Sequence, residues 1–209
     1  KNIPGTLRFL FQPAEEIAPG GAAVMIKAGA IDNVDHILGA HILPSLSPNK
    51  IGIRHGPMAA AVEQININLR GPGGHTSRPL ESVDLIGAQS YLVTALEKAM
   101  KLNLNKKDRF VLAFGKIMGG HTCNVLPDLI QLEGTLRFLN SELRQKLHKI
   151  IHNTIDSVEK KTGSKIEFNI PYSSPGLIND NNCTELIISS AIKSLGKENV
   201  IMMEESSMG

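Results

Sequence analysis

Two adjacent carboxylates and one histidine are the residues whose types and spacing could hold a metal ion. Glu15 and Glu16 follow an apolar run that is broken at Pro13, and His41 ends a second apolar run. Carboxylate and neutral imidazole are good ligands for Zn²⁺, and a free carboxylate beside a metal-bound water is the usual general base in metal-dependent hydrolysis. The spacing alone leaves alternatives open. A glutamate pair is most often a solvated helix start, and a histidine after a strand is more often a surface or core residue.

The two apolar runs predict the strands that would position these side chains. Residues 6–12 form a short apolar run bounded by a glycine and a proline, which suits a buried strand. Residues 36–41 predict a second strand, and residues 20–28 between them have helical spacing and a glycine stop. We therefore expect a right-handed β-α-β unit with parallel strands, which places Glu16 and His41 at the same edge of a sheet.

The middle of the chain, from about residue 62 to residue 170, predicts a complete small domain. Two segments have helical spacing, residues 83–100 and 143–158, with Asn140 or Ser141 as cap of the second and Gly163 as its stop. Strands are indicated at residues 62–69, 110–117, 130–138 and 166–170. The resulting order, β-α-β-β-α-β, is the ferredoxin-like pattern. After it, a helix over residues 184–195 and a strand over residues 200–203 return to an α/β rhythm.

Composition narrows the class of protein. A content of 42% hydrophobic and 20% charged residues is ordinary for a soluble globular protein. A net charge of +2 without a long basic run gives no indication of nucleic acid or an anionic membrane as a partner, and no apolar stretch is long enough to span a bilayer. No signal peptide is visible in the first residues. Cys123 and Cys183 do not make a disulfide framework, so we expect a cytoplasmic protein with both cysteines packed.

Five short motifs, taken together and in this order, resemble those of the M20 metallopeptidases. They are Phe11-Gln12-Pro13-Ala14-Glu15-Glu16, Gly39-Ala40-His41, Gly71-Pro72-Gly73-Gly74-His75, Asn124-Val125-Leu126-Pro127 and Gly134-Thr135-Leu136-Arg137. The sequence is most similar to the amidohydrolase branch, which includes hippurate hydrolases, auxin-conjugate hydrolases and N-acetyl-diaminopimelate deacetylases. Each motif alone is weak, but five of them in family order around an inserted domain are specific.

The resemblance implies a role for each of these motifs. Glu15 would be the general base that activates a water molecule, and Glu16 and His41 would be ligands of two divalent metal ions, Zn, Mn, Co or Ni. His75 resembles the family's histidine that helps to stabilise the oxyanion, since a donor aimed at that charge lowers the barrier. Without the resemblance, His75 would be a turn histidine in water.

Two further residues of the inserted domain resemble substrate-binding residues of the family. Asn124 resembles the asparagine that hydrogen-bonds the substrate or the intermediate. Arg137 resembles the arginine that receives the substrate's free carboxylate, a task that its planar fork suits. Without the resemblance, Arg137 would be an exposed strand arginine in an ion pair with Glu133 or Glu142.

The implied fold class is α/β: a partial, mostly parallel-sheet metallopeptidase domain with an inserted ferredoxin-like lid and dimerisation domain. Residues 1–58 and 172–209 would belong to the catalytic domain, and residues 59–171 to the lid. The family takes further ligands from segments that are not in this chain, and residues 206–209 resemble only the opening of the family's Met-Gly-x-Glu-Asp-Phe motif. Because a catalytic zinc needs about three protein ligands, we expect the chain by itself to be inactive.

The function implied by the resemblance is metal-dependent hydrolysis of the amide bond of N-acyl amino acids or related small amides. The enzyme would be a homodimer that associates through the lid. Two alternatives stay open at this point: a non-catalytic fragment or pseudo-enzyme that acts as a dimerisation or binding module, and a metallopeptidase for small peptides.

Other polar residues give weaker signals. The glycine-rich segment 71–74 lacks the Lys-Ser/Thr of a P-loop, so it predicts a turn. His148 and His152 lie four residues apart on a predicted helix, a spacing that can bind metal, but the surrounding lysines favour a solvated face. His121 and Cys123 differ from the small residues that we expect before the Asn124 motif.

Overall fold

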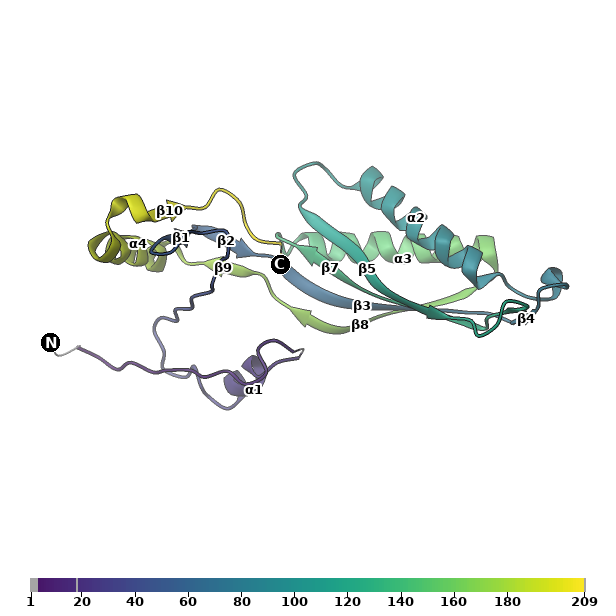
Figure 1. The fold of residues 1–209 in the computed structure, drawn as a ribbon, viewed down its shortest axis with the longest axis horizontal. Coiled ribbons are helices and arrows are strands. Elements are labelled where there is room, and N and C mark those ends of the chain that lie inside the picture. Colours follow the sequence, from purple (N-terminus) through teal and green to yellow (C-terminus); the bar gives the residue numbers. More distant parts are fainter. Residues whose placement is uncertain (1–3, 18, 209) are drawn as a thin grey trace. The chain divides into compact units, whose positions relative to one another are not determined.

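The computed structural model describes residues 4–17 and 19–208, which fall into two units, residues 1–45 and residues 46–209 (Figure 1). The prediction that no signal peptide is present concerns mainly residues 1–3. The resemblance to the opening of the Met-Gly-x-Glu-Asp-Phe motif ends at Gly209. These positions lie outside the described residues.

The first unit contains a single regular element in its described residues, the short helix α1 (Ala22–Lys27). This confirms the helix predicted over residues 20–28. The strands predicted over residues 6–12 and 36–41 are wrong: neither segment is a strand or joins a sheet. A strand needs a hydrogen-bonded neighbour, and an apolar run does not provide one. The apolar side chains of both segments are exposed, and Phe11 keeps 86% of its surface.

A four-stranded antiparallel sheet is the largest sheet of the second unit. Its strands are β3 (Ala61–Arg70), β5 (Phe110–Gly119), β7 (Leu129–Phe138) and β8 (Lys165–Ser174), in the order β5-β7-β3-β8. Helices α2 (Leu85–Asn103) and α3 (Leu143–Thr162) lie together on one face of the sheet (Figure 1). The chain order β3-α2-β5-β7-α3-β8 is the β-α-β-β-α-β order that the sequence predicts.

The hydrophobic core lies between this sheet and its two helices. The alternating positions of β3 and the helical stripes of α2 and α3 meet there, as their periods of two and 3.6 residues require. Members that are almost completely buried include Ile65, Ile67, Leu69, Leu85, Leu92, Leu96, Leu132, Leu136, Leu147 and Ile151. Each such side chain contributes about 1.5–3 kcal/mol relative to exposure, so this layer is the main source of stability in the unit.

Two element ends differ from the prediction. The N-cap of α3 is Glu142, although Asn140 Oδ1 accepts a hydrogen bond from the Glu142 N–H at 2.9 Å. Gly163 ends the helix as predicted, with φ +76°. Strand β8 continues through Pro171, where we expected it to stop. Proline is tolerated there because β8 is an edge strand and its pairing with β3 is irregular between Asn169 and Tyr172.

The segments before and after the sheet pair with each other. Strand β1 (Ile51–Ile53) runs parallel to β10 (Val200–Met202), and β2 (Gly56–Ala59) runs antiparallel to β9 (Leu177–Asn179). Helix α4 (Asn181–Leu195) lies between β9 and β10 and confirms the helix predicted there. Parallel pairing in the described residues is limited to β1–β10 and one bridge, so a mostly parallel sheet is not formed by them.

A cluster of ionisable side chains around the buried Glu63 joins β3 to α3. Glu63 is completely buried; Arg144 Nε lies 2.6 Å from its Oε1 and His148 Nε2 lies 2.6 Å from its Oε2. The ring of Phe168 meets His148 and His152 edge-on. The prediction of a solvated face is therefore wrong for His148, because its side chain contacts a buried carboxylate. For His152 the prediction is confirmed, since this residue is exposed.

Candidate functional site

Glu15 and Glu16 lie in a tight turn, residues 13–16, and both are exposed. The backbone fixes this turn. Ala14 has φ +51°, a left-handed conformation that few residues other than glycine adopt. Gly21, just before α1, lies against Pro13, where a Cβ would approach the proline carbonyl oxygen to 2.5 Å. The proline and the glycine together hold the two carboxylates at an exposed corner.

His41 has a defined hydrogen bond that decides its tautomer. Its Nδ1 lies 2.7 Å from the main-chain oxygen of Ile42. A carbonyl oxygen can only accept, so Nδ1 carries a hydrogen, and in the neutral ring Nε2 has the lone pair. This is how metal-binding histidines are commonly oriented, with one nitrogen held by an acceptor and the other left for the metal.

The donor chemistry of Glu16 and His41 fits a divalent cation, since carboxylate oxygen and imidazole nitrogen are both ligands of Zn²⁺ and Mn²⁺. Two protein ligands are too few to complete a catalytic metal site. Within residues 4–17 and 19–208, no three or more His, Cys, Asp or Glu side chains come together in a group that could hold a metal ion.

The structure brings His75 and Asn124 to neighbouring positions. Strand β4 (Gly74–His75) pairs with β6 (Val125–Leu126), and the Thr76 N–H donates to the Asn124 carbonyl oxygen at 3.0 Å. The turn predicted for the glycine-rich segment is not formed: residues 71–73 are irregular and Gly74 begins β4. Close approach of the backbone explains one of these glycines. A Cβ on Gly73 would lie 2.7 Å from the Leu126 carbonyl oxygen.

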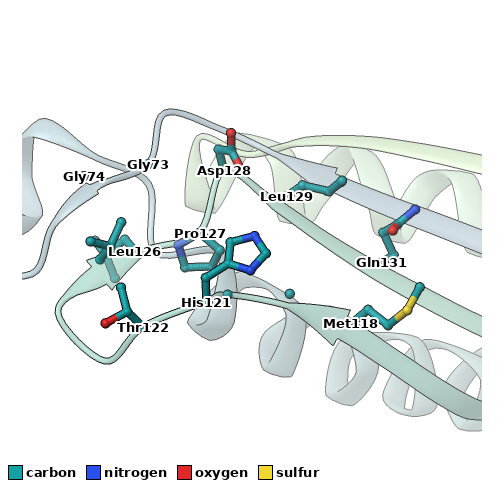
Figure 2. A pocket seen from close by; sticks show the side chains of 13 residues that line it. Gly73, Gly74, Met118, His121, Thr122, Leu126, Pro127, Asp128, Leu129 and Gln131 are labelled. Carbon is teal, nitrogen blue, oxygen red and sulfur yellow. The ribbon is translucent and has the colours of Figure 1, made fainter.

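Two open pockets lie beside this strand pair. One has a volume of 720 Å³ and is lined in part by His121, Thr122 and Asp128; Figure 2 shows the His121 side chain next to Pro127. The other has a volume of 490 Å³ and is lined in part by His75. His121, which the sequence marked only as a departure from the family, thus lines a pocket close to Asn124.

Arg137 lies at the other end of the sheet. It is half-buried in β7, and its Nη1 donates to the main-chain oxygen of Met208 at 2.9 Å. Neither predicted ion pair is formed in the described residues, and Glu133 instead pairs with Lys116 at 2.7 Å. Residue 137 is eight positions from Leu129, the first residue of β7, so at ~3.3 Å per residue it lies ~26 Å along the strand from the His75 end. One small molecule cannot contact Arg137 and His75 of the same chain.

The two cysteines differ in environment. Cys123 is exposed in the loop before Asn124, so the prediction that it is packed is wrong. Cys183 is half-buried at the start of α4, where partial burial, and then Asp180, raises the pKa of its thiol. Neither cysteine belongs to a candidate ligand group in the described residues.

The described helices include none with the length and apolar character needed to cross a membrane.

A family model described as peptidase family M20/M25/M40 matches residues 1–209. The chain belongs to this family. The structural neighbours of this M20 chain include a dinuclear metal-binding M20 peptidase from Bacillus subtilis, at a TM-score of 0.74 and 28% identity, with 95% of this chain and 49% of the other covered.

Curated relatives extend the comparison. The chain is 37% identical over 208 residues to a Synechocystis sp. protein named "Probable hydrolase", covering 100% of this chain and 53% of that protein. It is 34% identical over 178 residues to an N-acyl-L-amino acid amidohydrolase of Geobacillus stearothermophilus, covering 85% of this chain and 48% of the enzyme. The chain therefore spans about half the length of the curated relatives it matches.

Proposed function

We propose that this chain is part of a metal-dependent amidohydrolase that releases the amino acid from N-acyl amino acids. The observation that carries the proposal is the family match over residues 1–209, joined to 34% identity with an N-acyl-L-amino acid amidohydrolase. The tautomer of His41 supports it, because Nε2 is left available for a metal ion.

In this proposal Glu16 and His41 are ligands of two divalent ions, Zn, Mn, Co or Ni, together with ligands from outside the chain. When bound, such ions polarise the substrate carbonyl and lower the pKa of water. Glu15 takes a proton from the attacking water and passes it to the leaving amine. Because the described residues hold no complete ligand group, we propose that the 209-residue chain is inactive by itself.

Three residues of the segment 59–171 bind the substrate. His75 donates to the carbonyl oxygen as negative charge develops on it, and Asn124 hydrogen-bonds the substrate or the intermediate. Arg137 receives the free carboxylate of the amino acid through its planar fork. This carboxylate distinguishes N-acyl amino acids from simple amides, so Arg137 is the proposed determinant of substrate class.

We further propose that the enzyme is a cytoplasmic homodimer. Arg137 and His75 of one chain are too far apart for one substrate, so a second copy is needed to supply one of them. Strand β5 is an edge strand on which Val111, Ile117 and Met118 are exposed, which suits pairing with another chain. In this arrangement residues 59–171 form a ferredoxin-like lid and dimerisation domain, and residues 1–58 and 172–209 belong to the catalytic domain.

Arg137→Ala tests the substrate class in the whole protein that contains this chain. With N-acetyl amino acids we expect metal-dependent release of the amino acid, and Arg137→Ala should raise KM about 10- to 100-fold, as expected for loss of a charge-assisted hydrogen bond worth ~1.5–3 kcal/mol. The preference for a free carboxylate over the corresponding primary amide should disappear. Release is measured by chromatography of the free amino acid.

Arg70→Ala is the matched control, because Arg70 is also a strand arginine and is exposed beside Glu167. It should leave KM unchanged. Failure to release any amino acid with any of the four metals would contradict the proposed reaction. An unaltered preference for the carboxylate in Arg137→Ala would contradict the role of Arg137.

A further inference from the structure

Two hydroxyl side chains lie close to His75 and Asn124, the residues that we propose as hydrogen-bond donors to the substrate. Each hydroxyl is hydrogen-bonded to an acceptor atom of one of these two residues. Ser77 lies two residues after His75, and Thr122 lies two residues before Asn124. Neither belongs to the motifs that carry the family resemblance. Both make side-chain hydrogen bonds to the functional residue beside them.

The contacts of His75 determine which of its nitrogens carries the hydrogen. Its Nδ1 accepts from the Ser77 main-chain N–H at 3.2 Å and lies 2.7 Å from Ser77 Oγ. A main-chain N–H can only donate, so in the neutral ring Nδ1 is the acceptor and Nε2 carries the hydrogen. The Ser77 hydroxyl then also donates to Nδ1. Nε2–H has no partner in the described residues and is left as a donor.

The side-chain amide of Asn124 is also held with its acceptor oxygen hydrogen-bonded. The Thr122 hydroxyl donates to Asn124 Oδ1 at 3.0 Å. The amide nitrogen, with two hydrogens, has no side-chain partner in the described part of the chain. His75 and Asn124 therefore both present N–H groups outward, and their acceptor atoms are occupied. An oxygen that gains negative charge needs donors and is repelled by lone pairs.

We infer that Ser77 and Thr122 are positioning residues that hold His75 and Asn124 as hydrogen-bond donors toward the reacting oxygen. Neither hydroxyl is assigned contact with the substrate. The inference rests on the proposed function for its catalytic meaning, but the tautomer of His75 is a property of the chain itself.

The tautomer is measured on the 209-residue chain by multiple-bond ¹H–¹⁵N correlation of the histidine rings at alkaline pH. The chain has seven histidines, so His75→Gln identifies the His75 signals by their loss. We expect the Nε2–H form in the unaltered chain. Ser77→Ala should increase the minor Nδ1–H form about fivefold, the effect of one hydrogen bond. Ser77→Thr should restore the original spectrum.

Thr76→Ala is the matched control, since the exposed Thr76 bonds Asn124 through its main chain, which this change preserves. It should leave the His75 spectrum unchanged. An Nδ1–H form in the unaltered chain, or an unchanged ratio in Ser77→Ala, would overturn the inference. These outcomes do not depend on turnover, so they are separate from failure of the proposed function.

In the whole protein, the two hydroxyls should affect turnover and not binding. Ser77→Ala and Thr122→Val should each lower kcat about fivefold with KM unchanged, and Thr122→Ser should restore kcat. If amide hydrolysis occurs and both variants keep the original kcat, the inference is wrong. If no hydrolysis occurs at all, the proposed function fails and the tautomer ratio alone decides the inference.

Discussion

Glu15→Gln should reduce kcat of the whole protein by about 10²–10⁴-fold, the usual contribution of a general base. The amide keeps the size and shape of the side chain in the exposed turn at residues 13–16 but cannot take up a proton. KM should change little, because Glu15 is not proposed to bind the substrate. The measurement is steady-state release of the amino acid from an N-acetyl amino acid.

Glu198→Gln is the matched control, as Glu198 is another exposed glutamate in the short helix η2 (Lys197–Asn199) and carries no proposed role. It should retain full activity. A kcat of Glu15→Gln equal to that of the control would remove Glu15 from the mechanism. Metal content measured in parallel should be the same in both variants, because neither residue is a proposed ligand.

Arg144→Met should destabilise the 209-residue chain by about 2–3 kcal/mol. The guanidinium neutralises the fully buried Glu63, and its loss leaves that carboxylate with His148 as its remaining partner. An uncompensated buried charge typically costs ~3–5 kcal/mol, and we reduce this figure because His148 stays and Arg144 is itself about half exposed. The measurement is the midpoint of urea unfolding, followed by circular dichroism.

Arg78→Met provides the comparison, because Arg78 and Glu81 form an exposed pair at 3.9 Å. Loss of such a pair should cost at most about 1 kcal/mol. The triple variant Glu63→Leu, Arg144→Met, His148→Leu should be more stable than Arg144→Met alone, since it leaves no buried charge unpaired. Equal midpoints for Arg144→Met and Arg78→Met would contradict the proposed energetics of the cluster.

The four-stranded sheet could be predicted because its signals are local. Strands β3, β7 and β8 alternate apolar and polar residues, and β5 is a mainly apolar run. Each helix carries an apolar stripe, and the sheet and helices bury these faces against one another. The segments 6–12 and 36–41 have an equally apolar pattern, yet form no strand. Their pattern indicates burial but does not supply the neighbouring strand that a ladder requires.

The cluster around Glu63 was not predicted, although the sequence pattern of β3 contains a signal for it. Glu63 lies in phase with Ile65, Ile67 and Leu69, which places it on the buried face of β3. A carboxylate in that position requires a partner, and the histidine and arginine of α3 provide it. The lysines around His148 pointed to a solvated face, but they occupy other sides of the helix.

The sequence proposes the residue types of the candidate site, but their arrangement follows from the sequence only in part. The motifs located His75 and Asn124, and the β4–β6 pair places them side by side. The distance from them to Arg137 follows from strand register, which the motifs do not contain. Ser77 and Thr122 act through hydrogen bonds over two residues, and only atomic positions reveal those bonds.

The most direct test of the account is the metal content of the whole protein after depletion and reloading with Zn²⁺ or Mn²⁺, measured by elemental analysis. We predict about two ions per chain, as two-metal hydrolytic sites require, and about one or fewer in the double variant Glu16→Ala, His41→Ala. If the double variant binds as many ions as the unaltered protein, then Glu16 and His41 are not ligands and the proposed metal centre is wrong.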